Sequence, residues 1–412
     1  MDSDVVVSAG LLDRWPLYDR QMEGHGALDD ARRKLFLKST LEQIPVTRIT
    51  DITPLDVLGI PVFAAVTPLA RDLTTHLGKG VDRETARVSA LMEAVERVCA
   101  EDVGERVSRH ATYRELLTSG ACAADPLSFD LPPFTRYHPD WPIEWVEGWE
   151  LMAARPIWVP ADLARSPARE GLLDQVDTNG LASGFTYGRA LRSAILEVVE
   201  RDAVSQHHFF ERYGQAGEAG PVGRRIDLDS LPAEQRALAE RARQANLELI
   251  LDDLTGDLEI PVIACTLTDP SFCGAAGPMP LVVAGWGADL LASAAVTHAI
   301  LEAFQSRLGV IHGARDSYNQ VPFSRRASLS ATAAPAAEHD FSTLPNADLP
   351  DLGAQIQHVL ERLTSAGITQ VIVIDMSRKS LSLPVVRVRI PGLSLYTVDP
   401  RRAGWRSARH LL

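Results

Sequence analysis

Several features that mark large classes of protein are scarce or missing in this sequence. Its 412 residues include four cysteines, and none of them forms a CxxC pair. They are Cys99, Cys122, Cys265 and Cys273. The spacing of the last two fits no common zinc pattern. We therefore expect buried free thiols in a reducing compartment rather than disulfides or a zinc site.

Positive charge is also scarce. The formal net charge is −13, and lysine occurs only as Lys34, Lys38, Lys79 and Lys379. Proteins that grip a nucleic-acid backbone are usually basic. The charge therefore argues against nucleic acid as a partner.

Long uninterrupted apolar runs are absent as well. The most apolar stretch, residues 280–304, contains Asp289, His298 and Glu302, so it cannot form a membrane-spanning helix. The first residues start acidic and have no basic region of the kind that opens a secretory signal. We expect a cytoplasmic protein without a membrane partner.

The pattern that is present is one of helices alternating with strands, which predicts the α/β class. Helices are expected within residues 1–45 and over 82–103, 187–210, 233–246, 290–311 and 353–366. Strands are expected within 46–68 and over 143–151, 155–163, 247–254, 260–267, 369–376 and 384–390. Glycine-rich loops are expected at Gly78-Lys79-Gly80 and at residues 178–184, and a long surface loop over 313–352.

One nine-residue pattern occurs twice, and a looser copy occurs a third time. SALMEAVER at residues 89–97 recurs as SAILEVVER at residues 193–201, and AILEAFQSR at residues 299–307 is the looser copy. Drawn as a helix, the first copy places Ser89, Glu93 and Glu96 opposite its apolar face. The second copy repeats this arrangement with Glu197 and Glu200.

Two such helices facing each other would bring four carboxylates together. Carboxylate oxygens suit hard cations such as Mg²⁺, which completes its shell with water and substrate phosphate. Nearby cations that could contact phosphate oxygens are Lys79, Arg97, Arg201 and Arg307. The competing interpretation is a solvent-exposed helix face. The recurrence favours a phosphate-handling magnesium site, although Gly78-Lys79-Gly80 does not complete a Walker A motif.

The same segments resemble the YcaO family. The resemblance lies in HLGKGVDRETARVSALMEAVERV (76–98), TNGLASGFTYGRALRSAILEVVERDA (178–203), THAILEAFQSRLGVIHGARD (297–316), VVRVRIPGL (385–393) and TRITDITPLDVLGIPV (47–62). It implies an α/β (α+β) fold with internally repeated helix and sheet units around a nucleotide site. It also implies a helical extension over 1–44, an ATP-binding catalytic domain over 45–395 and a C-terminal tail over 396–412.

The resemblance further implies roles for individual residues, with ATP and Mg²⁺ as cofactors. The residues that match the magnesium ligands of the family are Glu93, Glu96, Glu197 and Glu200. Those that match nucleotide-contacting positions are Lys79, Ser89, Arg201, Glu302, Gln305 and Arg307. The chain departs from the family pattern at Phe185 and Arg189, and its tail has no proline-rich motif.

The activity that the resemblance implies is ATP-dependent activation of a backbone amide in a ribosomally made precursor peptide. We expect cyclodehydration to an azoline (thiazoline or oxazoline) or to a macrocyclic amidine. The alternatives are thioamide formation with a helper protein and a non-catalytic scaffold that holds a peptide. The expected partners are the precursor peptide, a possible helper protein and a second copy of the chain in a homodimer.

Overall fold

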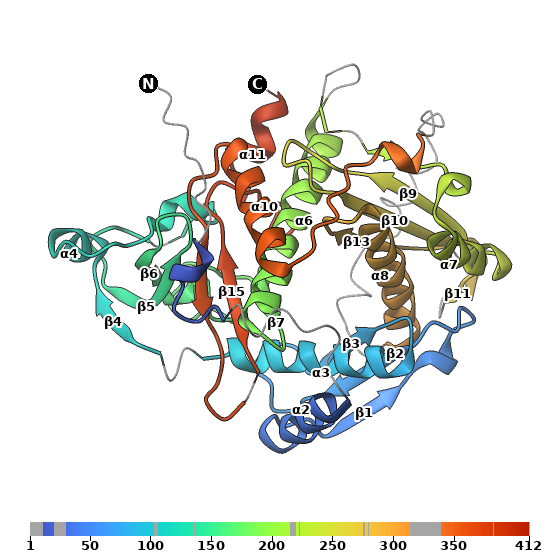
Figure 1. Ribbon diagram of the computed structural model, residues 1–412, viewed down its shortest axis with the longest axis horizontal. Coiled ribbons are helices and arrows are strands. Elements are labelled where there is room, and N and C mark those ends of the chain that lie inside the picture. The colour runs from blue at the N-terminus through green and yellow to red at the C-terminus, as the bar shows by residue number, and fades with distance from the viewer. Residues whose placement is uncertain are drawn as a thin grey trace.

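The computed structural model describes residues 11–19, 30–102, 106–135, 137–214, 220–221, 223–274, 277–278, 280–313, 339–381 and 383–411. Three groups of strands surround two long central helices, α6 (Tyr187–Tyr213) and α8 (Ala292–His312) (Figure 1). All pairs between the described strands of these sheets are antiparallel. The mixed helix and sheet prediction is confirmed, in its α+β form.

The first sheet lies at the N-terminal side and has the order β1-β2-β3. Its strands are β1 (Arg48–Asp51), β2 (Val62–Val66) and β3 (Thr75–Lys79). Helix α3 (Arg83–Ala100) follows β3 directly and packs on β2 and β3. Asp82 caps this helix, because its side chain accepts a hydrogen bond from the Thr85 backbone N–H at 2.8 Å. Helix α2 (Asp30–Gln43) contacts α3.

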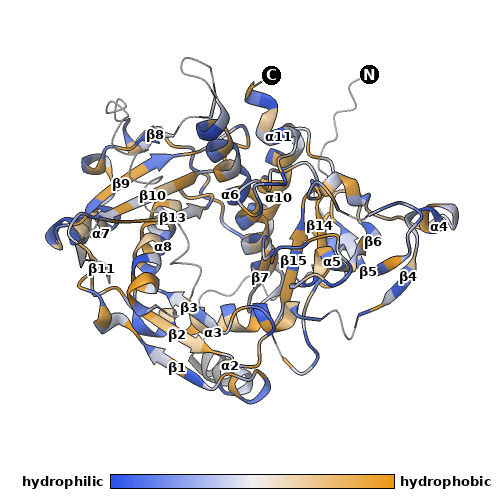
Figure 2. Cartoon of the chain, turned by 180° about the vertical axis from the view of Figure 1, so that it is seen from behind, coloured by the Kyte–Doolittle hydropathy of each residue, from blue (hydrophilic) through white to orange (hydrophobic). Residues whose placement is uncertain are grey.

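The second sheet has the order β13-β10-β9-β8. Its strands are β8 (Arg224–Arg225), β9 (Glu248–Asp253), β10 (Val262–Asp269) and β13 (Leu281–Ala288). Helix α8 packs on β13 and β10, and helix α7 (Ala233–Gln244) packs on α8 and β9. The apolar residues of β10 and β13 that pack against α8 are therefore buried, and Figure 2 shows where hydrophobic residues lie along the chain.

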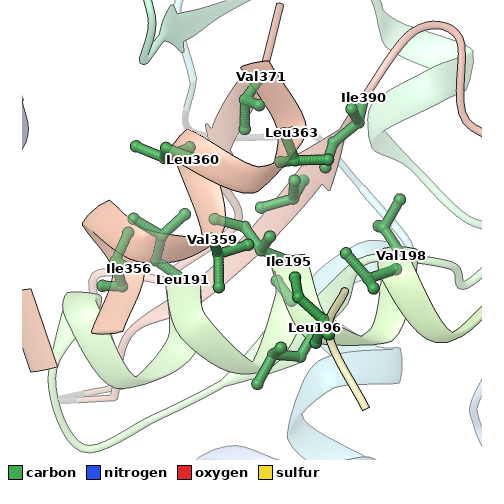
Figure 3. Close-up of a cluster of buried hydrophobic side chains, with 14 of the residues drawn as sticks. Leu191, Ile195, Leu196, Val198, Ile356, Val359, Leu360, Leu363, Val371 and Ile390 are labelled. Carbon is green, nitrogen blue, oxygen red and sulfur yellow. The ribbon is translucent and has the colours of Figure 1, made fainter. Parts of the chain in front are cut away.

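The third sheet has six strands, with the order β4-β5-β14-β15-β7 and with β6 paired to β5. These strands are β4 (Ser108–Ala111), β5 (Ile143–Glu150), β6 (Arg155–Pro160), β7 (Leu181–Ser183), β14 (Ile372–Asp375) and β15 (Val385–Arg389). Helix α6 packs on β15 and β7, and α10 (Leu352–Ser365) packs on α6. Figure 3 shows the interlocking leucine, isoleucine and valine side chains of α6 and α10.

Short elements complete the described chain. The short helices and turns are η1 (Leu12–Arg14), η2 (Thr53–Leu55), α4 (Tyr113–Thr118), η3 (Pro126–Phe129), α5 (Ala161–Ala164), η4 (Leu228–Ser230), η6 (Phe341–Thr343), α11 (Trp405–Ala408) and η7 (Arg409–Leu411). The short strands are β11 (Cys273–Gly274) and β12 (Gly277–Pro278). No described helix combines the length and the apolar character needed to cross a bilayer.

Glycines set how closely each helix approaches the strand before it. A Cβ atom added to Gly78 would collide with the backbone of Ala86 and Ala90 in α3. A Cβ atom added to Gly285 would likewise collide with the backbone of Ala299 and Ala303 in α8. The absence of a side chain at these positions lets helix and strand backbones nearly touch.

Three expectations from the sequence are wrong. Gly78 and Lys79 belong to strand β3 rather than to a loop, and residues 181–183 of the second expected loop form β7. Residues 281–288 form the strand β13, which the sequence did not predict. Within residues 1–45 the expected helix is α2 at Asp30–Gln43, and residues 11–19 form a strap with the short turn η1, whose Leu12 and Trp15 are buried in the core. Most of the expected surface loop at 313–352 lies outside the described residues.

Candidate functional site

A cavity of about 600 Å³ opens where α3, α6, α8, β3 and β7 meet, near the lower centre of Figure 1. Most of the residues singled out in the sequence line it. They are Lys79, Ser89, Glu93, Glu96, Glu197, Arg201, Glu302 and Gln305. Segments more than 200 residues apart in the chain thus contribute to one site.

Helical spacing explains why these side chains share one wall. Ser89, Glu93 and Glu96 lie on the face of α3 that turns away from its buried residues Leu91 and Val95. On α6, Ser193, Glu197 and Arg201 are four residues apart and line the opposite wall. The repeated pattern therefore supplies two facing polar stripes.

Burial and mutual repulsion change the acidity of the glutamates. Burial raises the pKa of Glu96 to about 7, although Ser183 donates hydrogen bonds at 2.7 Å to Glu96 Oε1 from both its backbone N–H and its hydroxyl. Burial raises the pKa of Glu197 to about 7 as well, with Glu96 adding repulsion and Arg201 opposing the rise. Carboxylates that are this costly to ionise would be relieved by a bound cation.

Glu200 is buried beside Arg201 and is not among the residues that line the cavity. Its side chain is buried, and burial raises its pKa to about 8, with Glu302 and Glu197 adding to the effect of burial. Arg201 lies 3.8 Å from it and opposes the rise. The Arg201 guanidinium also lies over the Trp286 ring, 5.7 Å from its centroid.

Hydrogen bonds join strand β3 to helices α8 and α3 at the cavity. Lys79 Nζ donates to Glu302 Oε2 at 3.0 Å. Gln305 Nε2 donates to the Leu77 carbonyl at 2.6 Å, and the Leu77 N–H donates to Glu93 Oε2 at 3.1 Å. These contacts fix Lys79, Glu93, Glu302 and Gln305 relative to one another.

Arg307 does not line the cavity. It is buried, its Nη1 lies 2.8 Å from Asp269 Oδ2, and its Nε lies 3.2 Å from Asp56 Oδ1. It fastens α8 to the loop before β2 and to the end of β10. The Arg307 guanidinium is thus paired with the carboxylates of Asp56 and Asp269 rather than directed to a ligand in the cavity.

The structure also brings residues to the cavity that the sequence did not single out. The polar ones are Thr85, Thr178, Ser183 and Ser306. Arg97, named only for its charge, is a further lining residue. Ser193 was visible in the repeat, whereas no sequence pattern connects Ser183 with Glu96. The departures lie elsewhere: Phe185 packs edge-on against Phe36, and Arg189 is exposed.

The donor set of the cavity fits Mg²⁺ and a nucleotide. Carboxylate oxygens from α3 and α6 are the ligands that Mg²⁺ prefers, and Lys79, Arg97 and Arg201 supply cations for phosphate. Among the described residues, no three acidic, histidine or cysteine side chains converge into a complete metal site. Mg²⁺ keeps several waters and substrate oxygens in its shell, so a site of this open kind suits it.

Comparison with known families agrees with this geometry. The model of the YcaO cyclodehydratases, described as ATP- and Mg²⁺-binding, matches residues 77–394. An uncharacterized protein of Methanothermobacter thermautotrophicus is 34% identical over 381 residues, covering 89% of this chain and 94% of its own length. A protein from the tfuA 3′ region of Rhizobium leguminosarum bv. trifolii is 30% identical over 396 residues, covering 90% of this chain and 88% of its own.

Two solved structures share the fold. YcaO from Methanopyrus kandleri, bound with AMPPCP and Mg²⁺, superposes with a TM-score of 0.73 at 25% identity, covering 94% of this chain and 96% of that one. A heterocyclase in complex with substrate and cofactor has a TM-score of 0.72 at 22% identity, over 88% of this chain. The match spans about half of that heterocyclase, 52% of its length.

The resemblance noted in the sequence is therefore confirmed, together with the fold class and the expectation of ATP and Mg²⁺ as cofactors. The repeated glutamate helices, the cavity between them and the matching family model lead to one assignment: this chain is an enzyme of the YcaO family of ATP- and Mg²⁺-binding cyclodehydratases.

Proposed function

We propose that this enzyme activates a backbone amide of a ribosomally made precursor peptide with ATP and Mg²⁺, and closes an azoline or a macrocyclic amidine ring. The observation that carries the proposal is the cavity in which glutamates of the two repeated helices face each other beside Lys79, Arg97 and Arg201. Carboxylates for Mg²⁺ and cations for phosphate are the groups that binding of a triphosphate requires.

The proposed reaction balances without a further reactant. A side-chain thiol or hydroxyl, or the amine at the peptide N-terminus, adds to the amide carbonyl and loses its proton. The resulting oxyanion attacks the γ-phosphorus of ATP, and ADP leaves. Loss of phosphate and of the amide N–H proton then forms the C=N bond. Phosphate leaves far more readily than the amide oxygen it replaces, which is why ATP is needed.

The protein contributes position and charge to this sequence. Bound Mg²⁺ would neutralise phosphate charge, and Glu93, Glu96, Glu197 and Glu200 are the residues proposed to hold it. Lys79 and Arg201 are proposed to contact phosphate oxygens. Ser89 and Gln305 are proposed to contact the rest of the nucleotide. The contribution of Glu302 runs through Lys79, which it holds at 3.0 Å.

Mass spectrometry of a candidate precursor peptide tests the proposal. Candidate peptides, chosen from short reading frames near the gene, are incubated with enzyme, ATP and Mg²⁺. Loss of one water per ring, with matching ADP release, is the expected result, and fragmentation locates an azoline or an amidine. An unmodified peptide with no ADP released would favour the scaffold alternative.

Glutamate variants connect the chemistry to the cavity. Glu93→Gln and Glu200→Gln should lower ATP turnover by roughly 100-fold or more, because each removes a proposed magnesium ligand. Glu84→Gln on the exposed first turn of α3 is the matched control and should behave as the wild type. Near-normal ADP release by both Glu93→Gln and Glu200→Gln would contradict the proposed site.

Thioamide formation with a helper protein is the second candidate. The observation that favours it is that the rhizobial relative is encoded in the tfuA 3′ region, so a neighbouring gene product is a candidate helper. In this reaction sulfide replaces the amide oxygen. The same spectra distinguish the two, because the peptide gains sulfur for oxygen instead of losing water.

A further inference from the structure

The loop between β2 and β3, residues 67–74, reaches the last turns of α3 and contacts it twice. Asp72 Oδ2 accepts a hydrogen bond from Arg97 Nη1 at 2.7 Å. The Arg71 backbone N–H donates to Glu101 Oε1, also at 2.7 Å. Neither Asp72 nor Glu101 is among the residues that line the cavity.

Arg97 connects this loop to the cavity. It is a lining residue, and its side chain and that of Asp72 are largely buried, at 18% and 13% exposed. The internal repeat gives it a counterpart, because Glu96-Arg97 on α3 corresponds to Glu200-Arg201 on α6. Both arginines line the same cavity, one on each side.

The partner of Arg97 distinguishes it from the other two lining cations. Lys79 is paired with Glu302, and Arg201 lies beside Glu200, so both are engaged by acidic groups of the site. Arg97 donates its hydrogen bond to Asp72, which lies outside the lining, and forms only a longer ion pair with Glu93. Its Nη2 lies 4.0 Å from Glu93 Oε1, which is beyond hydrogen-bond distance. The Nη2 edge of this lining residue is therefore not hydrogen-bonded to Glu93.

Arg97 and Glu93 are four residues apart on one helix, and such a pair attracts on the helix surface. Without Asp72, the guanidinium would close onto Glu93. The guanidinium would then no longer contact phosphate, and Glu93 would no longer coordinate Mg²⁺. With Asp72 bound at 2.7 Å, the guanidinium lies 4.0 Å from Glu93, beyond hydrogen-bond distance.

We propose that Asp72 is a positioning residue of the nucleotide site, which holds Arg97 away from Glu93 so that the guanidinium contacts the outer phosphates of the nucleotide. This inference rests on the proposed function, because it takes ATP and Mg²⁺ as the occupants of the cavity. An arginine fork already held by one carboxylate loses little freedom when it binds a phosphate through its other edge. The loop between β2 and β3 is thereby part of the site without lining it.

Calorimetric binding of AMPPCP with Mg²⁺, and of AMP as the comparison ligand, tests the inference on the full chain. Arg97→Gln should weaken AMPPCP–Mg²⁺ binding by roughly 30-fold or more, because charge-assisted hydrogen bonds to phosphate are lost. Asp72→Asn should weaken it by roughly 10-fold. Both variants should bind AMP within about two-fold of the wild type, since AMP lacks the outer phosphates.

The double variant and a loop control separate positioning from folding. Arg97→Gln combined with Asp72→Asn should bind no more weakly than Arg97→Gln alone, because Asp72 acts only through Arg97. Glu101→Ala removes the other contact of the same loop and should leave AMPPCP–Mg²⁺ binding within about two-fold of the wild type.

Several results would overturn the inference. These are binding of AMPPCP–Mg²⁺ by Asp72→Asn within about two-fold of the wild type, equal losses for AMP and AMPPCP, or additive effects in the double variant. A wild-type chain that binds no AMPPCP–Mg²⁺ would refute the proposed function itself, and the inference with it. A wild type that binds while the Asp72 variant is unaffected refutes the inference alone.

Discussion

Three glutamates at the site hold protons more tightly than ordinary carboxyl groups. Burial raises the pKa of Glu96 and of Glu197 to about 7 and that of Glu200 to about 8. Their contribution to folding stability is therefore complete below the ordinary glutamate pKa and is lost as pH rises through about 7 to 8. Without a cation the site therefore favours protonated carboxyl groups, whereas Mg²⁺ binding requires ionised ones.

Magnesium binding should consequently release protons near neutral pH. Ligand carboxylates must be ionised, so AMPPCP–Mg²⁺ binding at pH 7 should release about one to two protons, and fewer at pH 9. Calorimetry in two buffers of different ionisation enthalpy measures this number. Glu200→Gln should lower it by about one. Identical binding heats in both buffers at pH 7 would contradict the expectation.

At the scale of elements, the site depends on how closely the helices approach their strands. Gly78 of β3 lies against the backbone of α3, so any side chain at this position pushes the helix away. Helix α3 carries Glu93, Glu96 and Arg97, and its displacement would move all three. The glycines are thus as much a part of the site as the charged residues.

Gly78→Ala should destabilise the protein by about 3 kcal/mol or more and weaken nucleotide binding, because the new Cβ atom meets backbone that cannot yield. Gly256→Ala is the matched control, since nothing lies within 4 Å of its added Cβ atom. Urea unfolding of the two variants measures the difference. Equal stability would show that α3 adjusts freely on β3.

Arg307 also fixes the position of a helix, because it pairs α8 with Asp56 and Asp269. Arg307→Gln leaves Asp56 and Asp269 buried without their cation, which should cost about 3–5 kcal/mol of folding stability. The loss should appear in the absence of nucleotide, when measured by urea unfolding. A variant that folds normally and loses only ATP affinity would instead restore the nucleotide contact that the resemblance implies.

Helices were predictable from the sequence where apolar residues recur with helical spacing over a long segment. Residues 82–103 and 187–210 were expected as helices and form α3 and α6. The strand β13 was missed because a short apolar run next to a helix has no period that separates strand from helix. The glycines of Gly78-Lys79-Gly80 predict a loop because glycine usually marks a turn, whereas in this fold Gly78 permits close packing of β3 on α3.

The candidate site, too, was predictable from the sequence only in part. The repeat exposed the glutamates of α3 and α6, because identical spacing on two helices is visible in the sequence alone. The pairing of Arg307 with Asp56 and Asp269 was not predictable, and neither was that of Arg97 with Asp72. These pairs depend on how separate elements meet, which no local spacing records.

Across the whole molecule, buried ion pairs tie the last residues of the chain to its interior. Asp177 Oδ2 accepts hydrogen bonds at 2.9 Å from Arg389 of β15 and from Arg402 near the C-terminus. Arg387 Nη2 lies 3.2 Å from the other oxygen. Arg406 lies 2.8 Å from Asp202 of α6 and 2.7 Å from Asp257. The C-terminal segment is therefore held at two buried carboxylates.

Asp177→Asn should destabilise the fold by about 3–5 kcal/mol at pH 7, because it leaves three arginines around a neutral side chain. Although burial opposes it, the effect of Arg389, Arg387 and Arg402 holds the pKa of Asp177 well below its usual range. Its stabilisation is thus present above the ordinary aspartate pKa and is lost as pH falls through the lowered value.

Unfolding curves at neutral and acid pH check this expectation, and the two proteins should converge as pH falls. Asp174→Asn is the control, because Asp174 pairs with Arg401 at 2.5 Å on the surface and should contribute about 1 kcal/mol or less. Similar losses for both variants would show that the buried cluster carries no special weight.

The distribution of the cavity residues along the chain also bears on protein synthesis. Lys79 and Glu93 leave the ribosome early, Glu197 follows, and Glu302 comes more than 200 residues after the first of them. Since domains begin to fold from the N-terminal end as they are made, the first two thirds of the nascent chain are finished before a binding cavity can exist. Nucleotide would then stabilise only the completed enzyme, and newly made chains would have to keep α3 and α6 in place without it.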